Sequence, residues 1–372
     1  MPSVSPSKLL TLLLLVTLTT GTTFGQATEG KPKKPVAQPT NTEQSIEALF
    51  GPNEEEAKDP ATEKVDPTNG EPVMFISDTD NGRVVIMQGI KGYGYTSVGL
   101  PGYGFGRFLR PAQVWVDYQR RLYVADSGNN RVVRMDQSSD GGWAEMEGFS
   151  SPMGVAADKN GIYIADTKAN RVVLIDELQT GRDFKEVLTH SQMTRPGSLW
   201  LDGDGALYIC AGEDPPGGKL FKTWMDNGRR RWKVFDGEGL QGSQFLPSML
   251  VTAGREMLFV DGSGQRLVEM RDMEGQRLRE FPFRRIREWR LSRPQGMAVD
   301  ETGKRFFIAD SGNDRILEVD GSGKVLGEFF GHSQDPTSVL RNPTSIFIYS
   351  PAPAPEPEED EEDGKGKKKK KK

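Results

Sequence analysis

Short apolar runs separated by polar turns repeat along the middle of the chain. The clearest stretch, residues 123–136, reads YVADSGNNRVVRMD and places two apolar runs on either side of a turn rich in Gly and Asn. Close copies occupy residues 163–176 and 307–320, and looser copies occupy residues 75–87 and 258–270. Gly and Asn tolerate the positive φ angles that a tight turn requires, so each copy predicts a β-hairpin.

Further apolar runs, each opened by a proline, alternate with the hairpins. They begin at Pro111, Pro152, Pro196, Pro247, Pro294 and Pro343. The aligned hairpin positions 78, 126, 166, 211, 261 and 310 are 48, 40, 45, 50 and 49 residues apart, and all but one are Asp. The segment between each hairpin and the next proline is long enough for a fourth strand. This spacing predicts an all-β fold, a six-bladed β-propeller of four-stranded antiparallel blades.

The two ends of the repeat region complement each other. The first hairpin, at residues 75–87, has no proline run before it, and the last proline run, at residues 343–348, has no hairpin after it. We therefore predict that the C-terminal strand, residues 344–348, pairs with residues 73–77 of the N-terminal blade and closes the ring. Closure would remove the exposed strand edges of an open sheet.

The repeat unit resembles the NHL repeat, whose signature is a Pro-x-Gly-Val-Ala-Val-Asp run followed by Gly-x-Leu-Tyr-Val-Ala-Asp and Asn-x-Arg-Val. Residues 152–158 (PMGVAAD) and 123–133 (YVADSGNNRVV) carry the likeness. The fourth unit departs from it at residues 208–221, which lack the Asp and the Arg and have a longer turn. The resemblance implies a six-bladed ring with the proline strand innermost. It implies no single activity, because such repeats resemble binding scaffolds for proteins or RNA as well as lactonase-like and amidating-lyase-like enzymes.

The N-terminal residues have the composition of an export signal. Lys8 and the apolar run 9–18 predict a signal peptide over residues 1–27, with Gly25 and Ala27 at the cleavage site. An uncleaved membrane anchor is the alternative, but this run is shorter than the roughly 20 residues of a spanning helix. We expect a secreted or periplasmic protein with no transmembrane segment after cleavage.

The remaining residues divide by composition into three parts. Hydrophobic residues make up only 35% of the 372-residue chain, and residues 28–70 and 351–372 are rich in Pro and charge. Such segments bury too little apolar surface to fold, so we expect a disordered linker at 28–70 and a disordered acidic, then polylysine, tail at 351–372. The propeller is expected to occupy residues 71–350.

An Asp and an Arg keep a constant five-residue offset across the hairpin turns. In an antiparallel hairpin this offset lets the guanidinium group reach back to the carboxylate. A catalytic group is expected to be unique, so five copies of one pair favour a structural role. The predicted turn pairs are Asp78/Arg83, Asp126/Arg131, Asp166/Arg171, Asp261/Arg266 and Asp310/Arg315.

A second set of arginines stands one or two residues before a proline. In a propeller of this order, these positions and the hairpin turns share the end of the ring at which the central channel opens. Converging arginines there would bind an anionic ligand. The alternative is that they pair with the hairpin aspartates and cap the junctions between blades. The candidate ligand-binding residues are Arg110, Arg195, Arg293 and Arg341.

Positive charge is concentrated in one arc of the ring. Residues 219–293, the basic arc, contain 16 Lys and Arg against 10 Asp and Glu, a net charge of +6. Two runs interleave arginines with aromatic residues, a pattern that suits phosphate or anionic glycan contact. The alternative is that they form the outer strands of two blades. The candidate residues are Arg229, Arg230, Arg231, Arg284, Arg285 and Arg287.

The sequence favours binding over catalysis. Only His190 and His332 are present, whereas an amidating-lyase-like zinc site needs several histidines. Four aspartates that would be candidate calcium ligands end their strands at turns, which their carboxylates are expected to serve: Asp117, Asp158, Asp202 and Asp300.

We therefore expect an exported, monomeric, non-enzymatic scaffold without a metal or cofactor. It would bind a protein or an anionic polymer through one face and the channel mouth, and export argues against nucleic acid as that polymer. The alternative is a calcium-dependent, lactonase-like hydrolase or lyase with its site in the central channel. Two further features stay open: Cys210 is expected to be a buried strand residue, and the aromatic loop 92–106 either covers one end of the channel or is a flexible connection.

Overall fold

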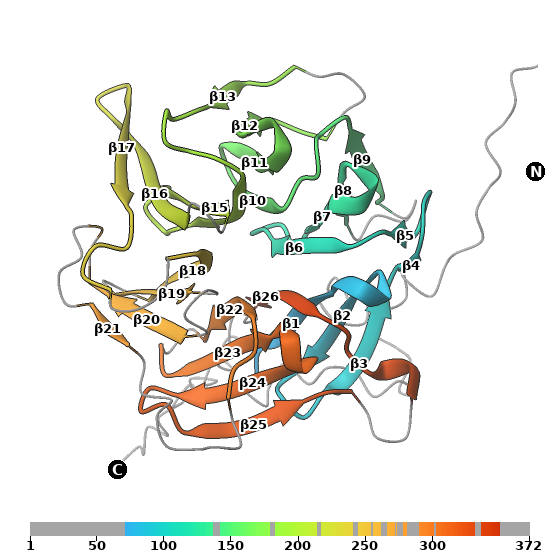
Figure 1. The fold of residues 1–372 in the computed structure, drawn as a ribbon. Helices are drawn as coiled ribbons and strands as arrows, with labels where there is room; N and C mark the ends of the chain where they lie inside the picture. The colour runs from blue at the N-terminus through green and yellow to red at the C-terminus, as the bar shows by residue number, and fades with distance from the viewer. Residues whose placement is uncertain are drawn as a thin grey trace, which may run out of the picture. The chain divides into compact units, whose positions relative to one another are not determined.

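The computed structural model describes residues 71–349 with gaps at 137–141, 179–182, 214–216, 241–244, 254–255, 262–265, 272, 274–277, 281–289, 301–302 and 332–335. The described chain is all-β and forms six four-stranded antiparallel sheets arranged in a ring (Figure 1). The predicted six-bladed β-propeller is therefore confirmed. None of the helices in the described part of the chain is long and apolar enough to cross a membrane.

Each blade consists of four consecutive strands, except that blade 1 takes its first strand from the C-terminal end of the ring. Blade 1 contains β26 (Pro343–Tyr349), β1 (Val73–Asp78), β2 (Arg83–Gln88) and β3 (Tyr93–Val98). Blade 2 contains β6 (Pro111–Val116), β7 (Leu122–Asp126), β8 (Arg131–Met135) and β9 (Ala144–Glu147). Blade 3 contains β10 (Gly154–Asp158), β11 (Gly161–Asp166), β12 (Arg171–Ile175) and β13 (Glu186–Leu188).

The other three blades follow in the same order. Blade 4 contains β14 (Pro196–Leu201), β15 (Leu207–Glu213), β16 (Gly217–Asp226) and β17 (Arg229–Phe235). Blade 5 contains β18 (Pro247–Ala253), β19 (Glu256–Asp261), β20 (Arg266–Met270) and β21 (Arg279–Glu280). Blade 6 contains β22 (Pro294–Val299), β23 (Arg305–Asp310), β24 (Arg315–Asp320) and β25 (Val325–Phe329). The short strands β4 (Leu100–Pro101) and β5 (Arg107–Phe108) form a separate parallel pair between blades 1 and 2.

The ring is closed by the strand from its C-terminal end. Strand β26 pairs antiparallel with β1 from Val73 opposite Tyr349 to Asp78 opposite Pro343, as predicted. The first strand of each blade contacts the first strands of both neighbouring blades, so the proline strands surround the central axis. Each proline strand starts at the end where the hairpin turns lie. We call this end of the ring the mouth end.

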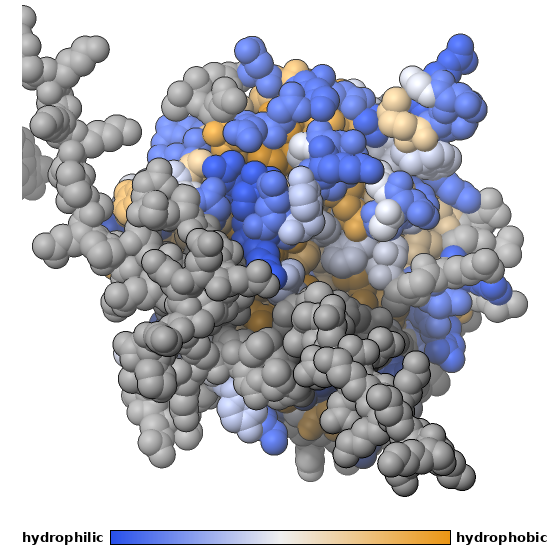
Figure 2. Space-filling model, turned by 180° about the vertical axis from the view of Figure 1, so that it is seen from behind, coloured by the Kyte–Doolittle hydropathy of each residue, from blue (hydrophilic) through white to orange (hydrophobic). Residues whose placement is uncertain are grey.

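The core lies between adjacent blades. The second strand of each blade is buried on both faces, so its sequence is continuously apolar rather than alternating. Aromatic side chains that occupy the same strand position in five blades fill the space: Phe75, Tyr123, Tyr163, Tyr208 and Phe307. On the side shown in Figure 2, hydrophilic side chains form much of the described surface and apolar side chains show between them.

The hairpin turns have the chemistry that the sequence predicts. In four blades the Asp is followed by one turn of 3-10 helix and then by a residue in the left-handed conformation. That residue is Gly82, Asn130, Asn170 or Asp314, with φ between 53° and 62°. Gly, Asn and Asp adopt this conformation at the lowest cost, which explains their place in the repeat.

Candidate binding site at the mouth of the central channel

Ion pairs hold all five predicted hairpins. In each, the arginine Nε donates to Oδ2 of the aspartate, at distances from 2.7 to 3.0 Å. The five aspartates are 0% or 1% exposed. Buried carboxylates of this kind need charged or hydrogen-bonded partners, because desolvation disfavours the ionised form. In blade 2, burial raises the pKa of Asp126, and hydrogen bonds from Asn129, Leu109 and Arg131 act in the opposite direction.

The same carboxylates also hold the segment that leads into the first strand of their blade. Oδ1 of each accepts a backbone N–H at 2.6 to 3.1 Å, from Leu109, Ser150, Leu246, Ser292 or Arg341. The arginines extend this contact, because Arg83 donates to the carbonyls of Thr337 and Val339. Each Asp–Arg pair thus joins a hairpin to the connection between blades. The sequence does not reveal this second role, since the acceptors on the connection are backbone carbonyls with no side-chain signature.

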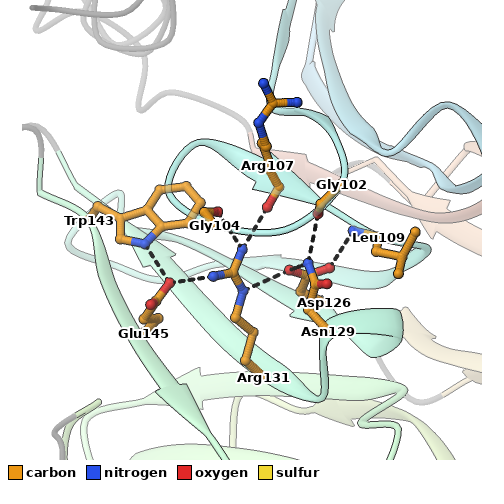
Figure 3. Close-up of polar contacts among 9 residues, drawn as sticks. All are labelled: Gly102, Gly104, Arg107, Leu109, Asp126, Asn129, Arg131, Trp143 and Glu145. Carbon is orange, nitrogen blue, oxygen red and sulfur yellow. Dashed lines mark hydrogen bonds and ion pairs between the residues drawn. The ribbon is translucent and has the colours of Figure 1, made fainter. Parts of the chain in front are cut away.

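In blade 2 this contact fixes the aromatic loop. Arg131 donates to the carbonyls of Gly104 and Arg107 at 2.9 and 2.6 Å, and Asn129 donates to that of Gly102 at 3.0 Å (Figure 3). Phe105 packs on Trp143 with ring centroids 5.1 Å apart. The loop is therefore tied to blade 2 rather than free, and none of residues 92–106 lines the central cavity described next.

A cavity of about 460 Å³ lies inside the mouth end of the ring. Its walls come from the first residues of the proline strands, with contributions from all six blades.

Gln113 of β6 closes the inner end of the cavity. Its side-chain amide donates to the Leu199 carbonyl at 2.7 Å and accepts from the N–H groups of Leu199 and Val155. Those partners lie in blades 4 and 3. Two residues further along β6, the Trp115 ring contacts Trp200 and Phe347, at 5.5 and 5.0 Å between centroids. The cavity is thus a blind pocket rather than an open channel.

The repeat pattern does not predict a role for Gln113, although the sequence carries a signal for it. It stands where the first strands of blades 3 and 6 have Gly154 and Gly296. A Cβ at Gly154 would collide with the carbonyl oxygen of Gly197, so only glycine fits at that position in blade 3. The other three blades have Ser198, Met249 and Ser345 at this position, so the side-chain amide is particular to blade 2.

The rim of the cavity contains two of the four predicted arginines. Arg195 and Arg293 line it, and Leu246, the residue before Pro247, lines it between them. Arg110 and Arg341 are exposed at the same end of the ring but do not line the cavity. The sequence thus predicts the correct end for all four residues, and the structure brings only two of them to one site.

Backbone strain accompanies these arginines. Arg110, Arg195 and Arg293 have φ of 52°, 48° and 45°, although each precedes a proline and none is a glycine. Such a conformation costs of order 1–3 kcal/mol and persists only where neighbouring contacts impose it. For Arg195 one such contact is the hydrogen bond from its backbone N–H to Asn170 Oδ1, at 2.8 Å.

Hydroxyl groups near the cavity link the blades. Ser198 donates to the Ser248 carbonyl at 2.6 Å, Ser248 to the Pro294 carbonyl at 3.2 Å, and Thr167 to the Pro196 carbonyl at 2.7 Å. Because their protons are engaged, these hydroxyls offer a ligand only acceptor lone pairs. The described residues that line the cavity include no Asp, Glu or His.

Cys210 is the one cavity residue with a thiol, and it is buried. Burial raises the pKa of this thiol to about 12, which keeps it protonated at neutral pH. We expect Cys210 of the native protein to resist iodoacetamide at pH 8 and to react fully after unfolding in guanidinium chloride. Mass spectrometry of the intact chain would measure the modified fraction. Native alkylation as fast as that of a free cysteine would contradict this assignment.

Only part of the basic arc can be placed. Arg229, Arg230 and Arg231 lie on β17, the outermost strand of blade 4, while Arg284, Arg285 and Arg287 lie outside the described residues. Arg230 pairs with Glu186 of blade 3, and Arg231 pairs with Asp226 of its own hairpin. Arg230 and Arg231 therefore make contacts between and within blades, and none of the three β17 arginines lines the cavity.

The four turn aspartates are engaged at the opposite end of the ring. Asp117 accepts hydrogen bonds from Arg121 and Tyr123, Asp202 from Ala206 and Tyr208, and Asp300 from Arg305. Asp158 accepts two from Asn160. Among the described residues, no group of three or more His, Cys, Asp or Glu side chains is placed to hold a metal ion.

Comparison with known proteins supports the class of fold. The chain is similar to a chain of a nidogen/laminin complex (18% identity, 75% of this chain and 99% of that one, TM-score 0.57). It is also similar to hydrazine synthase of Kuenenia stuttgartiensis (17% identity, 71% and 80%, TM-score 0.50) and to a streptogramin B lyase (14% identity, 75% and 87%, TM-score 0.49). No protein-family profile and no curated protein sequence matches the chain.

The protein is thus a member of the structural class of β-propellers. At these identities the likeness to solved structures extends to the fold alone. The resemblance of its repeats to the NHL family stays a prediction.

Proposed function

We propose that this protein is a binding scaffold that takes an anionic protein or an anionic polymer at the mouth end of the ring. The observation that carries the proposal is the position of Arg195 and Arg293 on a cavity whose described lining contains no carboxylate. Two exposed arginines at the rim of such a cavity create a positive potential that attracts and orients anionic groups. Arg110 and Arg341, exposed at the same end, extend the positive surface.

Two further observations support binding rather than calcium-dependent catalysis. Calcium requires six to eight oxygen ligands and favours carboxylates, whereas the four turn aspartates serve their own turns. The similar chain from a nidogen/laminin complex is a propeller found in an assembly of proteins. We further propose that the protein acts as an exported monomer, secreted or periplasmic, without a metal or cofactor.

The proposal is tested by replacing the rim arginines with glycine. Glycine accepts the positive φ at these positions without strain, so Arg195→Gly/Arg293→Gly should fold as well as the parent. The matched control is Arg110→Gly, which removes an exposed arginine of the same conformation that does not line the cavity. All variants carry Gln in place of the six lysines at 367–372, so that the terminal charges do not dominate binding.

Retention on heparin, used as a polyanionic probe, is the measurement. The double variant should bind about tenfold more weakly than the parent, since two charge contacts of roughly 0.7 kcal/mol each amount to that factor. The Arg110→Gly control should lose less. Equal elution of the double variant and the control would contradict a role for the cavity rim.

A further inference from the structure

The shape of the cavity restricts what can enter it. Gln113 and Trp115 close its inner end, so a ligand enters and leaves through the mouth. A polymer could lie across the mouth, but its middle part could not pass through the ring. The cavity of about 460 Å³ falls within the size range of small-molecule sites. The cavity can therefore hold a small molecule or the terminal group of a longer one.

The wall has an apolar sector between two cations and a further apolar side chain on the other side of one of them. Around the rim, Arg195 of blade 4 is followed by Leu246 at blade 5 and Arg293 at blade 6. Below Leu246 the wall continues with Pro247 and Met249, and Met153, which is 38% exposed, lines the cavity from blade 3. An inorganic anion would contact the arginines and leave this apolar surface in water, whereas an anion with an apolar body would cover it.

The polar groups of the wall add a third requirement. The hydroxyls of Ser198 and Ser248 donate to backbone carbonyls and can therefore only accept from a ligand. Carboxylate groups on the ligand are matched by the arginines at the rim, which can donate two parallel hydrogen bonds each. Ligand N–H groups deeper in the cavity are matched by the serine oxygens. A peptide terminus has this order of groups, and a small amphipathic carboxylate supplies the anion and the apolar body.

We infer that the cavity binds an amphipathic carboxylate, with the carboxylate between Arg195 and Arg293 and the apolar part on Leu246, Met249 and Met153. The inference rests on the proposed function, because it specifies the chemical group that the mouth end recognises. It selects the end of a peptide or a small carboxylic acid, and it assigns no role to the middle of a polyanion.

The test is calorimetric titration of the full chain with defined probes. Octanoate should bind with a dissociation constant of about 1 mM or tighter, and at least about tenfold more tightly than octanamide or inorganic sulfate. N-acetyl-Leu-Leu and its C-terminal amide form the second arm. Tighter binding of the peptide acid than of octanoate would identify a peptide terminus as the source of the carboxylate, and the reverse order a small acid.

Three variants locate the bound probe. Arg195→Gly/Arg293→Gly should abolish octanoate binding. Arg120→Gly, which removes an arginine with φ of 61° from the Asp117 turn at the opposite end of the ring, should leave it unchanged. Met153→Gln, at an exposed position, should weaken octanoate binding severalfold and leave heparin retention as in the parent.

Three results would overturn the inference. The first is the absence of binding by both octanoate and the peptide acid at concentrations up to about 10 mM. The second is equal binding of octanoate and sulfate, and the third is octanoate binding that the double variant retains. In each case, heparin retention that still depends on Arg195 and Arg293 would leave the proposed function standing without this ligand.

Discussion

Ending the chain at Arg341 is expected to destabilise the ring by about 5 kcal/mol or more, while ending it at Ser350 leaves stability unchanged. The first truncation removes all of β26, which pairs with β1 along its length and packs against β6 and β22. Ile346, which is 1% exposed, would lose roughly 1.5–3 kcal/mol of burial, and the partly buried Phe347 and Ile348 would each lose less. A loss of this size approaches the entire 5–15 kcal/mol stability of a typical domain.

Thermal unfolding followed by circular dichroism would measure both truncations. The chain that ends at Ser350 is the control, because it lacks residues 351–372, as the shorter chain does, but keeps all of β26. Equal melting temperatures for the two truncated chains would show that β26 does not close the ring. A second effect is expected in the short chain: β1 loses its strand partner and becomes a free edge, so the truncated protein should aggregate on standing.

Replacing Arg131 by Met is expected to cost about 3–5 kcal/mol, the usual penalty for breaking a buried ion pair from one side. The side chain of Arg131 is 3% exposed and its guanidinium contacts Asp126, Glu145 and two loop carbonyls. The variant leaves Asp126 buried with fewer donors, and it frees the loop that contains β4 and β5. Arg171→Met in blade 3 is the matched control, since Arg171 makes the equivalent pair with Asp166 but is 30% exposed.

Urea unfolding gives the stability of both variants, and limited digestion with chymotrypsin reports on the loop. Tyr103, 72% exposed, and Phe105 should be cut faster in Arg131→Met than in the parent or in Arg171→Met. If the two variants lose the same free energy of unfolding, the burial of Arg131 does not increase the contribution of its ion pair to stability. If Tyr103 and Phe105 keep their protection in Arg131→Met, other contacts must hold the loop.

Much of the fold follows from the repeat. The hairpin pattern, the proline runs and the phase difference between them predict six blades and the pairing of β26 with β1, because these features depend on local chemistry that recurs. Blade 4, the unit that lacks the repeated aspartate, nevertheless forms four strands. There the backbone N–H of Gly212 donates to the Arg195 carbonyl at 3.3 Å, so a main-chain contact reaches the connection that an aspartate holds in other blades.

The candidate site follows from the sequence only in part. The position before each proline predicts that Arg110, Arg195, Arg293 and Arg341 share one end of the ring. Which of them meet depends on where the channel is closed, and Gln113 closes it through a contact with Leu199, 86 residues away. A repeat alignment treats all blades as equivalent and does not register such a contact across the axis. Positions where one blade departs from the repeat, such as Gln113, are therefore the places to look for contacts across the axis.

The pairing of Val73 with Tyr349 has a consequence for how the molecule can be presented. Both residues lie at the end of the ring opposite the mouth, because Asp78 and Pro343, at the other ends of the same strands, lie at the mouth. A bead, sensor surface or fusion partner that is joined to the chain next to Val73 or Tyr349 is therefore attached at the end of the ring opposite the cavity. Immobilised in this way, the molecule displays Arg195 and Arg293 toward the solution, and a partner can approach them without meeting the support.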